Sequence, residues 1–384
     1  MRSFKVGSAF GIPIKLDLTF LLILPVFAWL IGSQVEQLAQ MLNTTFGAGL
    51  DVAMLTAGST PWLLGVAAAV GLFTGVVLHE LGHSVVAQHY GFPIESITLW
   101  IFGGVANLSE QPEDWKQEFF IAVAGPVVSV VLGVVCWVAL QAFPPSLDLL
   151  RFVFGYLALM NVVLAAFNLL PGFPMDGGRV LRALLARKRS FARATQIAAE
   201  VGKAFALLLG LVGLLGWNLI LIGIAFFIYI GASSEAQQTV MKAAFQDVQV
   251  ADVMTPAQDV KTVDPDTSVA ELMERMFQER HTGYPVMENG RLVGVVTLED
   301  ARDVREAERE AYTVEDVMTR EVQTIDPEEN AMDALEKMQE HGVGRLIVTD
   351  GDGELVGLLS RTDLMTAFNV IQTSGRQAKM PRTA

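Results

Sequence analysis

Two histidines and a glutamate lie within five residues of one another, in the run His79-Glu80-Leu81-Gly82-His83. On a helix, residues four positions apart share a face, so the imidazoles of His79 and His83 can bind one zinc ion. Glu80 would then lie beside the metal as a general base. The same pattern also occurs by chance in helices of soluble proteins, so its surroundings decide how it is interpreted.

The motif follows an uncharged apolar stretch, residues 62–78, which reads WLLGVAAAVGLFTGVVL. Ionisable side chains at membrane depth are costly and by default mark a functional site. An unligated His-Glu-His cluster in lipid has nothing to offset its desolvation. The apolar setting therefore favours a zinc site over a chance match.

A catalytic zinc site takes three protein ligands, and this motif supplies two. Besides Glu80, three acidic residues lie in or near the apolar segments: Asp176, Glu200 and Glu118. Asp176 lies between Pro and Gly residues in the stretch NLLPGFPMDGG, residues 168–178. Broken backbone at membrane depth is tolerated only where it is buried in protein or lines water. His89 is off the face shared by His79 and His83, and we expect it at the membrane interface.

Six stretches are long enough to span a bilayer, which requires about 20 apolar residues. They lie near residues 17–33, 62–88, 117–143, 150–171, 194–215 and 217–234. Basic residues cluster before the first stretch and within 179–193, whereas residues 32–61 contain no Lys or Arg. By the positive-inside rule both chain ends are cytoplasmic. The second and fourth stretches then bring the HExxH motif and Asp176 to the same cytoplasmic depth.

Charge divides the chain into two parts. Residues 1–245 carry 13 acidic and 13 basic side chains, whereas residues 246–384 carry 28 acidic and 14 basic ones. The whole net charge of −14 therefore belongs to the C-terminal part, which argues against nucleic acid as a partner. The single cysteine, Cys136, lies in an apolar segment and excludes both an intrachain disulfide and a multi-cysteine zinc site.

HELGH in an apolar segment, followed about 90 residues later by NLLPGFPMDGGR, resembles the site-2 protease family of intramembrane zinc metalloproteases. The resemblance covers residues 1–235. It includes Gly103-Gly104 and the turn Ala124-Gly125-Pro126, and Ser129 stands where relatives often have Asn.

This resemblance implies an endopeptidase that cleaves a transmembrane segment of a membrane-anchored substrate. Glu80 would be the catalytic acid/base and Asn168 a polar group near the substrate backbone. The implied ligands of one zinc ion per chain are His79, His83 and Asp176.

Residues 94–108 are rich in β-branched and aromatic side chains with partial alternation, which predicts strands. The peptide bonds of a transmembrane substrate are shielded until its helix unwinds. A strand edge beside the HELGH helix could pair with the unwound segment by β-augmentation. A purely structural hairpin at the membrane face is the alternative.

Residues 250–370 contain an internal repeat, in which Ala251-Asp-Val-Met-Thr255 recurs as Glu315-Asp-Val-Met-Thr319. Thr262-Val-Asp-Pro265 recurs in the same way as Thr324-Ile-Asp-Pro327. Each copy continues with a helix-period run and ends in an apolar strand with a polar signature. Strand-helix-strand-strand-helix repeated twice resembles a tandem pair of CBS (cystathionine β-synthase) domains.

CBS pairs often bind adenine nucleotides between their two copies, so the resemblance implies ATP, ADP or AMP as a ligand. The hydroxyl of Thr297 or Ser360 would meet phosphate, and the carboxylate of Asp300 or Asp363 would meet ribose. The full set implied is Thr262, Thr297, Asp300, Thr324, Ser360 and Asp363. The alternative is that Thr297 and Ser360 only cap the helices that follow them, with no ligand involved.

We therefore expect a polytopic α-helical membrane protein of about six spans, with a small membrane-associated β element and a cytoplasmic α/β CBS pair. We also expect a homodimer in the cell membrane, because CBS pairs commonly associate face to face. The expected boundaries are 1–235 for the transmembrane zinc metalloprotease domain, 236–249 for a linker, 250–310 and 311–370 for the CBS repeats, and 371–384 for a disordered tail.

Two other interpretations fit part of the sequence. A transporter or channel regulated by CBS domains would need a second acidic pathway along the other spans, and none is visible. A non-catalytic receptor with a relic zinc site would have no reason to keep Glu80.

Single-cysteine labelling tests the topology on which the shared depth of the two motifs depends. In a Cys136-free background, a membrane-impermeant thiol reagent should reach Gln40→Cys from outside the cell and Ser190→Cys only from the cytoplasm. Finding both positions on one side would contradict the predicted meeting of the HExxH motif and Asp176.

Overall fold

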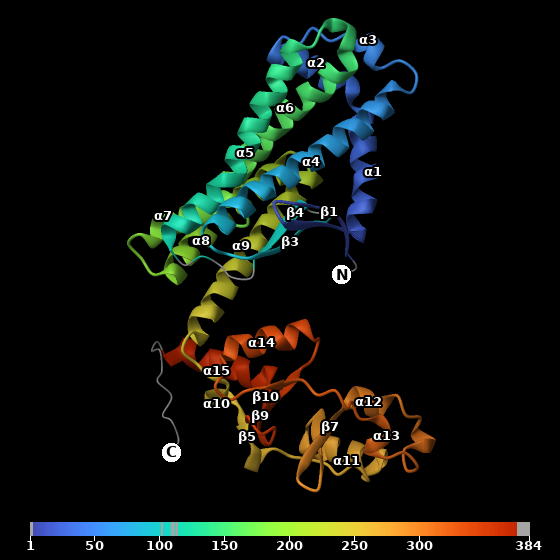
Figure 1. The fold of residues 1–384 in the computed structure, drawn as a ribbon, viewed down its shortest axis with the longest axis vertical. Helices are drawn as coiled ribbons and strands as arrows, with labels where there is room; N and C mark the ends of the chain where they lie inside the picture. Colours follow the sequence, from blue (N-terminus) through green and yellow to red (C-terminus); the bar gives the residue numbers. More distant parts are fainter. Residues whose placement is uncertain (1–2, 101–102, 109–111, 113, 375–384) are drawn as a thin grey trace. The chain divides into compact units, whose positions relative to one another are not determined.

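The computed structural model describes residues 3–100, 103–108, 112 and 114–374. The chain forms two compact units, Met1–Gln237 and Gln238–Ala384 (Figure 1). The last described helix ends at Ser374, so most of the tail expected at 371–384 lies outside the described residues.

Apolar helices make up most of the first unit. Their bounds are α1 Leu18–Ser33, α2 Val35–Phe46, α3 Val52–Leu55, α4 Thr60–His89, α5 Trp115–Ala142, η1 Pro145–Leu147, α6 Asp148–Asn168, α7 Asp176–Ala186, α8 Phe191–Leu215 and α9 Leu219–Phe245. Among the described residues, five helical segments are long and apolar enough to cross a membrane. The pair α1–α2, bent by 67°, makes a sixth if it counts as one span. This confirms a multi-pass membrane protein.

Small residues line the contacts between these helices. A β-carbon added to Gly65 of α4 would collide with the Ala28 carbonyl of α1. Large apolar side chains such as Val130 of α5 and Leu207 of α8 instead point outward and are 46% and 65% exposed. Small residues inside and large apolar residues outside suit a lipid environment, where close backbone packing rather than burial of apolar surface holds helices together.

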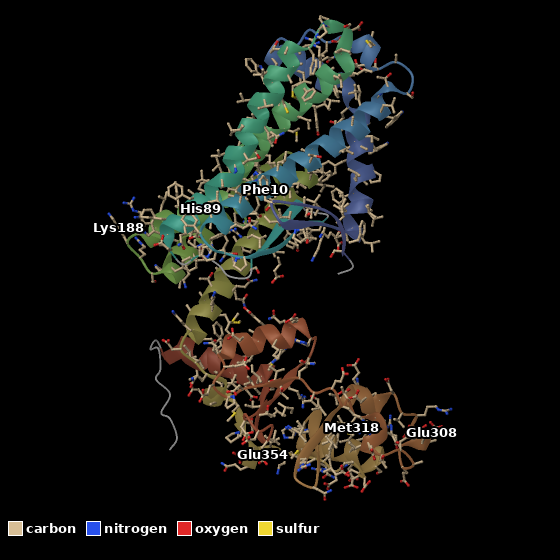
Figure 2. All side chains as sticks on the ribbon, viewed as in Figure 1. Phe10, His89, Lys188, Glu308, Met318 and Glu354 are labelled. Carbon is tan, nitrogen blue, oxygen red and sulfur yellow. The ribbon has the colours of Figure 1, made fainter. Side chains whose placement is uncertain are left out.

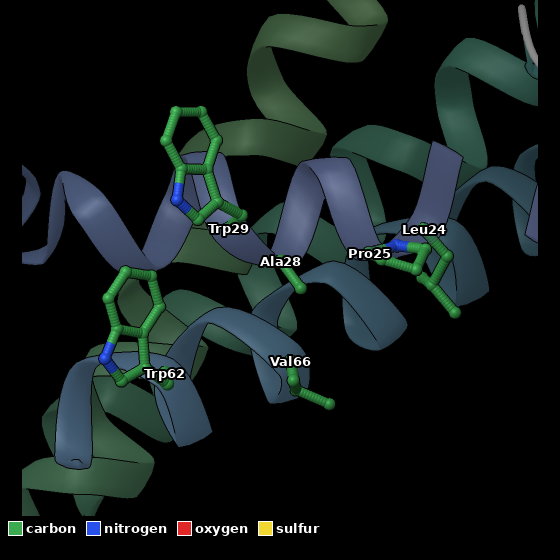
Figure 3. A pocket seen from close by; sticks show the side chains of 6 residues that line it. All are labelled: Leu24, Pro25, Ala28, Trp29, Trp62 and Val66. Atoms are coloured by element: carbon green, nitrogen blue, oxygen red, sulfur yellow. The ribbon is translucent and has the colours of Figure 1, made fainter. Parts of the chain in front are cut away.

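An apolar hollow of about 410 Å³ lies between α1 and α4 (Figure 3). Its lining residues are Leu24, Pro25, Ala28, Trp29, Trp62 and Val66, none of which is ionisable. The indole rings of Trp29 and Trp62 stand at one end of the hollow and are well exposed. Tryptophan is enriched at membrane–water interfaces, so these rings are placed as interfacial side chains rather than as catalytic ones.

A four-stranded sheet packs against α4. Its strands are β1 Ser3–Ala9, β2 Ile12–Asp17, β3 Ile94–Trp100 and β4 Gly103–Leu108, in the order β1-β2-β3-β4. The strands predicted within 94–108 are present, and β4 is the last in the sheet. The hairpin β1–β2 was not predicted; it turns at Phe10-Gly11, where both residues have positive φ. Ile12 and Ile97 bury the sheet's inner face against Leu81 of α4.

The second unit consists of two copies of one fold. The first copy contains α10 Val250–Val253, β5 Thr255–Pro256, η2 Ala257–Asp259, α11 Val269–Glu279, β6 Gly283–Glu288, β7 Arg291–Thr297, α12 Leu298–Arg302 and η3 Glu306–Glu308. The second contains α13 Val314–Val317, β8 Thr324–Ile325, α14 Ala331–Glu340, β9 Arg345–Thr349, β10 Leu355–Ser360 and α15 Arg361–Ser374. Both copies contain the order helix, strand, strand, helix (α11-β6-β7-α12 and α14-β9-β10-α15), which confirms the predicted α/β pair.

The segment that begins each copy, around Met254 in the first and Met318 in the second, packs on the other copy. Strand β5 pairs with β10 of the second copy, and Thr319 forms a bridge to Val295 of the first. A β-carbon added to Gly357 would meet the sulfur of Met254 at 2.6 Å, and one added to Gly294 would meet Met318. Each repeated methionine motif therefore packs on the opposite copy, so the two copies form one folded unit.

Candidate metal centre

His79 and His83 lie near the C-terminal end of α4, on one face of the helix. Both are buried, with 3% and 6% of their surfaces exposed. The helix begins with Pro61 in its first turn and continues to His89, which stands at the same end of the unit as the α7–α8 turn (Figure 2). The histidine pair thus lies inside the helical unit, within the last three turns of α4.

Asp176 is the first residue of α7. The preceding helix α6 ends at Asn168, because Pro171 and Pro174 cannot continue its hydrogen bonding. The connecting loop folds tightly onto the first turn of α7. A β-carbon added to Gly178 would collide with the backbone of that loop at Gly172 and Phe173. This close approach sets the position from which the Asp176 carboxylate reaches α4.

Three potential ligand atoms converge at this point. His79 Nε2 is 3.1 Å and His83 Nε2 is 3.2 Å from Asp176 Oδ2. The two Nε2 atoms are 3.2 Å apart. Over the part of the chain that the structure describes, this is the one group of three such side chains close enough to hold a metal ion. Two imidazoles and a carboxylate are the donor set of a catalytic zinc site that keeps a position open for water.

Helix α5 supplies the hydrogen-bond partners of both imidazoles. His83 Nδ1 lies 2.7 Å from the Ile121 carbonyl, which can only accept, so Nδ1 carries the proton and Nε2 keeps its lone pair. His79 Nδ1 lies 2.8 Å from the hydroxyl of Ser129, which is fully buried. Such partners fix the tautomer and the direction of a metal-binding histidine. The contribution of Ile121 has no sequence signal, because every residue offers a carbonyl.

Glu80 lies on the turn of α4 that faces β4. A β-carbon added to Gly104 would overlap the Glu80 side chain and stand 3.3 Å from Val76. The backbone of β4 therefore passes directly over this carboxylate-bearing turn. Because β4 ends the strand order, its outer edge is unpaired as far as the described residues show.

The other carboxylates considered from sequence lie elsewhere. Glu200 is exposed on α8 and forms an ion pair at the helix surface. Glu118 forms a buried ion pair with an arginine and does not join the cluster. Asn168 donates a hydrogen bond to the Leu164 carbonyl of its own helix, at 3.1 Å. Of the three carboxylates considered as the third ligand, Asp176, Glu200 and Glu118, the structure brings only Asp176 to the two histidines.

A polar cleft of about 670 Å³ lies between the two copies of the second unit. The lining residues that carry hydroxyl or basic side chains are Thr282, Thr297, Arg302, Thr319 and Arg345. Arg345 reaches across from the second copy, with Nη2 donating to Thr282 Oγ1 at 2.8 Å. Burial lowers the pKa of the Arg345 guanidinium, but an arginine remains protonated at physiological pH.

Of the six residues expected to bind nucleotide, Thr297 lines this cleft. The other five are not among its lining residues: Thr262, Asp300, Thr324, Ser360 and Asp363. The Thr297 hydroxyl donates to Asp300 Oδ2, and the Ser360 hydroxyl donates to Asp363 Oδ2, each at 2.7 Å. The helix-capping arrangement considered as the alternative is thus formed in both copies.

Sequence comparison matches residues 67–151 and 145–209 to peptidase family M50, and residues 250–306 and 314–370 to the CBS domain. A zinc metalloprotease of Methanocaldococcus jannaschii is 37% identical over 372 residues, which covers 97% of each chain. Rip3 of Mycobacterium tuberculosis is 34% identical over 382 residues, 95% of this chain and 92% of that protein.

Among solved structures, the site-2 protease from Methanocaldococcus jannaschii is 38% identical, covering 61% of this chain and 95% of that chain, with a TM-score of 0.43. Full-length similarity to metalloproteases coincides with the only His-His-Asp cluster found in the described residues. The chain belongs to the site-2 protease (M50) family of zinc metalloproteases and carries a C-terminal tandem CBS pair.

A glycine-to-alanine exchange tests the packing around His83. A β-carbon at Gly125 would overlap the His83 imidazole, so Gly125→Ala should displace the ring from the Ile121 carbonyl. Changes to the support of a metal ligand typically weaken metal binding by about 10-fold or more, and we expect that loss here.

Zinc affinity of the purified protein, measured by chelator competition, checks this prediction. Gly223→Ala is the matched control, because nothing lies within 4 Å of the carbon that it adds to α9. Wild-type zinc affinity in both variants would contradict the packing argument.

Proposed function

We propose that this zinc metalloprotease is an intramembrane endopeptidase that cleaves a transmembrane segment of a membrane-anchored substrate. The observation that carries the proposal is the convergence of His79, His83 and Asp176 inside a unit built from apolar spans. A buried catalytic centre among such helices is placed for a substrate that is itself in the membrane. The CBS pair is proposed to control the reaction.

His79 and His83 would hold one zinc ion through Nε2, and Asp176 through its carboxylate. Bound there, zinc lowers the pKa of a water toward about 7 and polarises the scissile carbonyl. Ser129 and the Ile121 carbonyl keep both imidazoles turned toward the metal position. The direction of the ligands is then set before substrate arrives.

Glu80 is proposed as the acid/base. It takes a proton from the attacking water and returns it to the leaving amine. Its place next to His79 on α4, outside the three-residue metal cluster, leaves its carboxylate available for proton transfer. The close passage of β4 at Gly104 gives the carboxylate a fixed wall on one side.

The unpaired edge of β4 supports a binding mode for the substrate. A transmembrane helix must unwind before its peptide bonds can be attacked, and an unwound segment needs partners for its backbone groups. Pairing with β4 by β-augmentation would supply them directly beside Glu80. Asn168, at the end of α6, is proposed to contact the substrate backbone by exchanging its bond to Leu164.

We propose that both termini are cytoplasmic and that cleavage occurs near the cytoplasmic end of the substrate span. Lys188, in the basic turn between α7 and α8, lies at the same end of the membrane unit as His89 (Figure 2). The positive-inside rule assigns that end to the cytoplasm. The metal cluster lies toward the same end, because α4 carries it in its last turns.

Two substitutions separate metal binding from turnover. Asp176→Ala should lose most of the zinc and all proteolysis, because a ligand is removed. Glu80→Gln should keep zinc and lose only turnover, because this side chain lies outside the ligand set. The measurements are bound zinc and cleavage of a reconstituted single-span substrate.

His89→Ala is the control, since it removes a histidine of the same helix that lies outside the cluster, and its zinc content should be unchanged. Full zinc retention and activity in Asp176→Ala would overturn the ligand assignment. Cleavage by Glu80→Gln at the wild-type rate would overturn the assignment of the base.

We further propose that the cleft of the CBS pair binds an adenine nucleotide. Its size is within the range of small-molecule sites, and the Thr297 hydroxyl and two arginines line it. Glu299 and Glu321 line it as well, so the charges balance and AMP is favoured over ATP. Asp300 contacts the cleft residue Thr297. Thr262, Thr324, Ser360 and Asp363 are proposed from the family resemblance, because they do not line the cleft.

A homodimer formed through the CBS pairs is part of the same proposal, because such pairs commonly associate face to face. Nucleotide binding changes proteolysis only if the ligand favours one arrangement of the pair over another. Control of cleavage therefore requires a difference in affinity between two states, not binding alone.

Calorimetry and cleavage assays on the full chain test this control. AMP should bind at or below millimolar concentration and change the cleavage rate. Asp300→Ala combined with Asp363→Ala should abolish the response without changing zinc content. Because both residues cap helices, Arg302→Gln, at an exposed cleft residue, serves as a second variant. If no nucleotide binds at millimolar concentration, the pair is instead a dimerisation or substrate-docking module.

A further inference from the structure

Arg182 of α7 lies at the centre of a buried ion cluster that joins three helices. It is 3% exposed. Its Nε is 2.5 Å from Glu118 Oε1 of α5, and its Nη1 is 2.7 Å from Glu235 Oε1 of α9. The guanidinium also lies over the rings of Phe173 and Phe191, at 4.9 and 4.6 Å from their centroids. One side chain thus contacts α5, α9 and the residues on both sides of α7.

The cluster connects the supports of all three proposed ligands. Arg182 stands on the helix that begins with Asp176. Glu118 stands on α5, one turn before Ile121, whose carbonyl holds the His83 ring. Further along the same helix, Ser129 contacts the His79 ring. The Arg182–Glu118 bond therefore ties the helix of the carboxylate ligand to the helix that orients both imidazoles.

Helix α9 contributes the second carboxylate and also packs on the loop before Asp176. Gly231 lies one turn before Glu235, and a β-carbon added there would stand 2.9 Å from Pro174. Ala232 packs in a buried group with Phe173. Asp176 is therefore flanked by α9 contacts on its N-terminal side through the loop and on its C-terminal side through Arg182.

Stability alone does not account for such a cluster. Burying charged groups is costly, and apolar side chains of similar volume often hold helices together equally well or better. One oxygen of Glu118, Oε2, is buried with no hydrogen-bond partner among the described residues. What a guanidinium adds is direction, because its planar fork fixes two partners at set angles.

We propose that Arg182 is a positioning residue of the metal centre, which aims the Asp176 carboxylate at the two histidines by holding α7 to Glu118 and Glu235. This inference rests on the proposed role of Asp176 as the third zinc ligand. Arg182 itself is not one of the three residues that could hold the metal.

Zinc affinity and the visible spectrum of the cobalt-substituted protein test the proposal. Arg182→Gln should weaken zinc binding by about 10- to 100-fold, the range for changes to groups that orient metal ligands. The cobalt absorption bands should change, because the carboxylate ligand shifts. The value of kcat should fall more than KM rises. Arg182→Lys keeps the positive charge but lacks the planar guanidinium, so it should lose less zinc affinity than Arg182→Gln.

Arg151→Gln is the matched control. Arg151 is also a buried arginine, 7% exposed, and its Nη1 is 2.7 Å from Asp148. It lies near the start of α6, and its Nη2 donates to the carbonyl of Ala48 between α2 and α3. Figure 1 shows α2 and α3 at the end of the membrane unit opposite to α7. This variant should lose thermal stability but keep wild-type zinc affinity and an unchanged cobalt spectrum. Equal losses of zinc affinity in both arginine variants would make the cluster merely structural and overturn the inference.

Two further variants keep the outcome decisive. If Arg182→Gln does not fold, Glu235→Gln removes one charge at constant volume from a side chain that is 24% exposed. It should weaken zinc binding in the same direction, and an unchanged affinity would overturn the inference. Asp176→Ala separates the two hypotheses. If Asp176→Ala retains zinc, the ligand assignment is refuted. If Asp176→Ala loses zinc while Arg182→Gln keeps wild-type zinc affinity, only the positioning role of Arg182 is refuted.

Discussion

His79 and His83 present their Nε2 atoms to Asp176 because α5 occupies both of their Nδ1 atoms. Polar groups at membrane depth need partners, since neither lipid nor apolar side chains can offer hydrogen bonds. A hydroxyl and a backbone carbonyl meet this need, and in doing so they fix which nitrogen faces the metal position. The helices around the centre are arranged so that this one set of bonds can form.

Close packing of backbones makes that arrangement possible. The His83 ring fills the space that a side chain at position 125 would take, and the Asp176 loop occupies the corresponding space at Gly178. In lipid, helix association depends on close van der Waals contact rather than on burial of apolar surface. Glycines at the metal centre therefore let the helices and the Asp176 loop approach closely, while large apolar side chains lie on the outside of the membrane unit.

The two parts of the chain differ in charge. Residues 1–245 carry no net charge, and two of their ion pairs, Arg151–Asp148 and Arg182–Glu118, are buried. Residues 246–384 carry the whole net charge of −14. Helix α9 belongs to both compact units. It packs beside the Asp176 loop through Gly231 and Ala232, and its last residue, Phe245, is buried in the core of the second copy of the CBS fold. Residues 236–245 of the linker expected at 236–249 are helical, as the last part of α9.

The sequence by itself determined the features that depend on local periodicity and composition. Residues four apart on a helix must share a face, so His79 and His83 could be paired from spacing alone, and apolar runs predicted the spans. The internal repeat likewise predicted the order of elements in the CBS pair. The family resemblance implied Asp176 as the third ligand, and only the tertiary structure shows its carboxylate beside the two histidines, with Glu118 and Glu200 elsewhere. The tertiary structure also decided that Ser129 and the Ile121 carbonyl hold the rings, that Arg182 ties α7 to α5 and α9, and that β1–β2 extends the sheet. Each of these contacts joins residues far apart in the chain, and the free energy that selects them comes from the packing of whole helices.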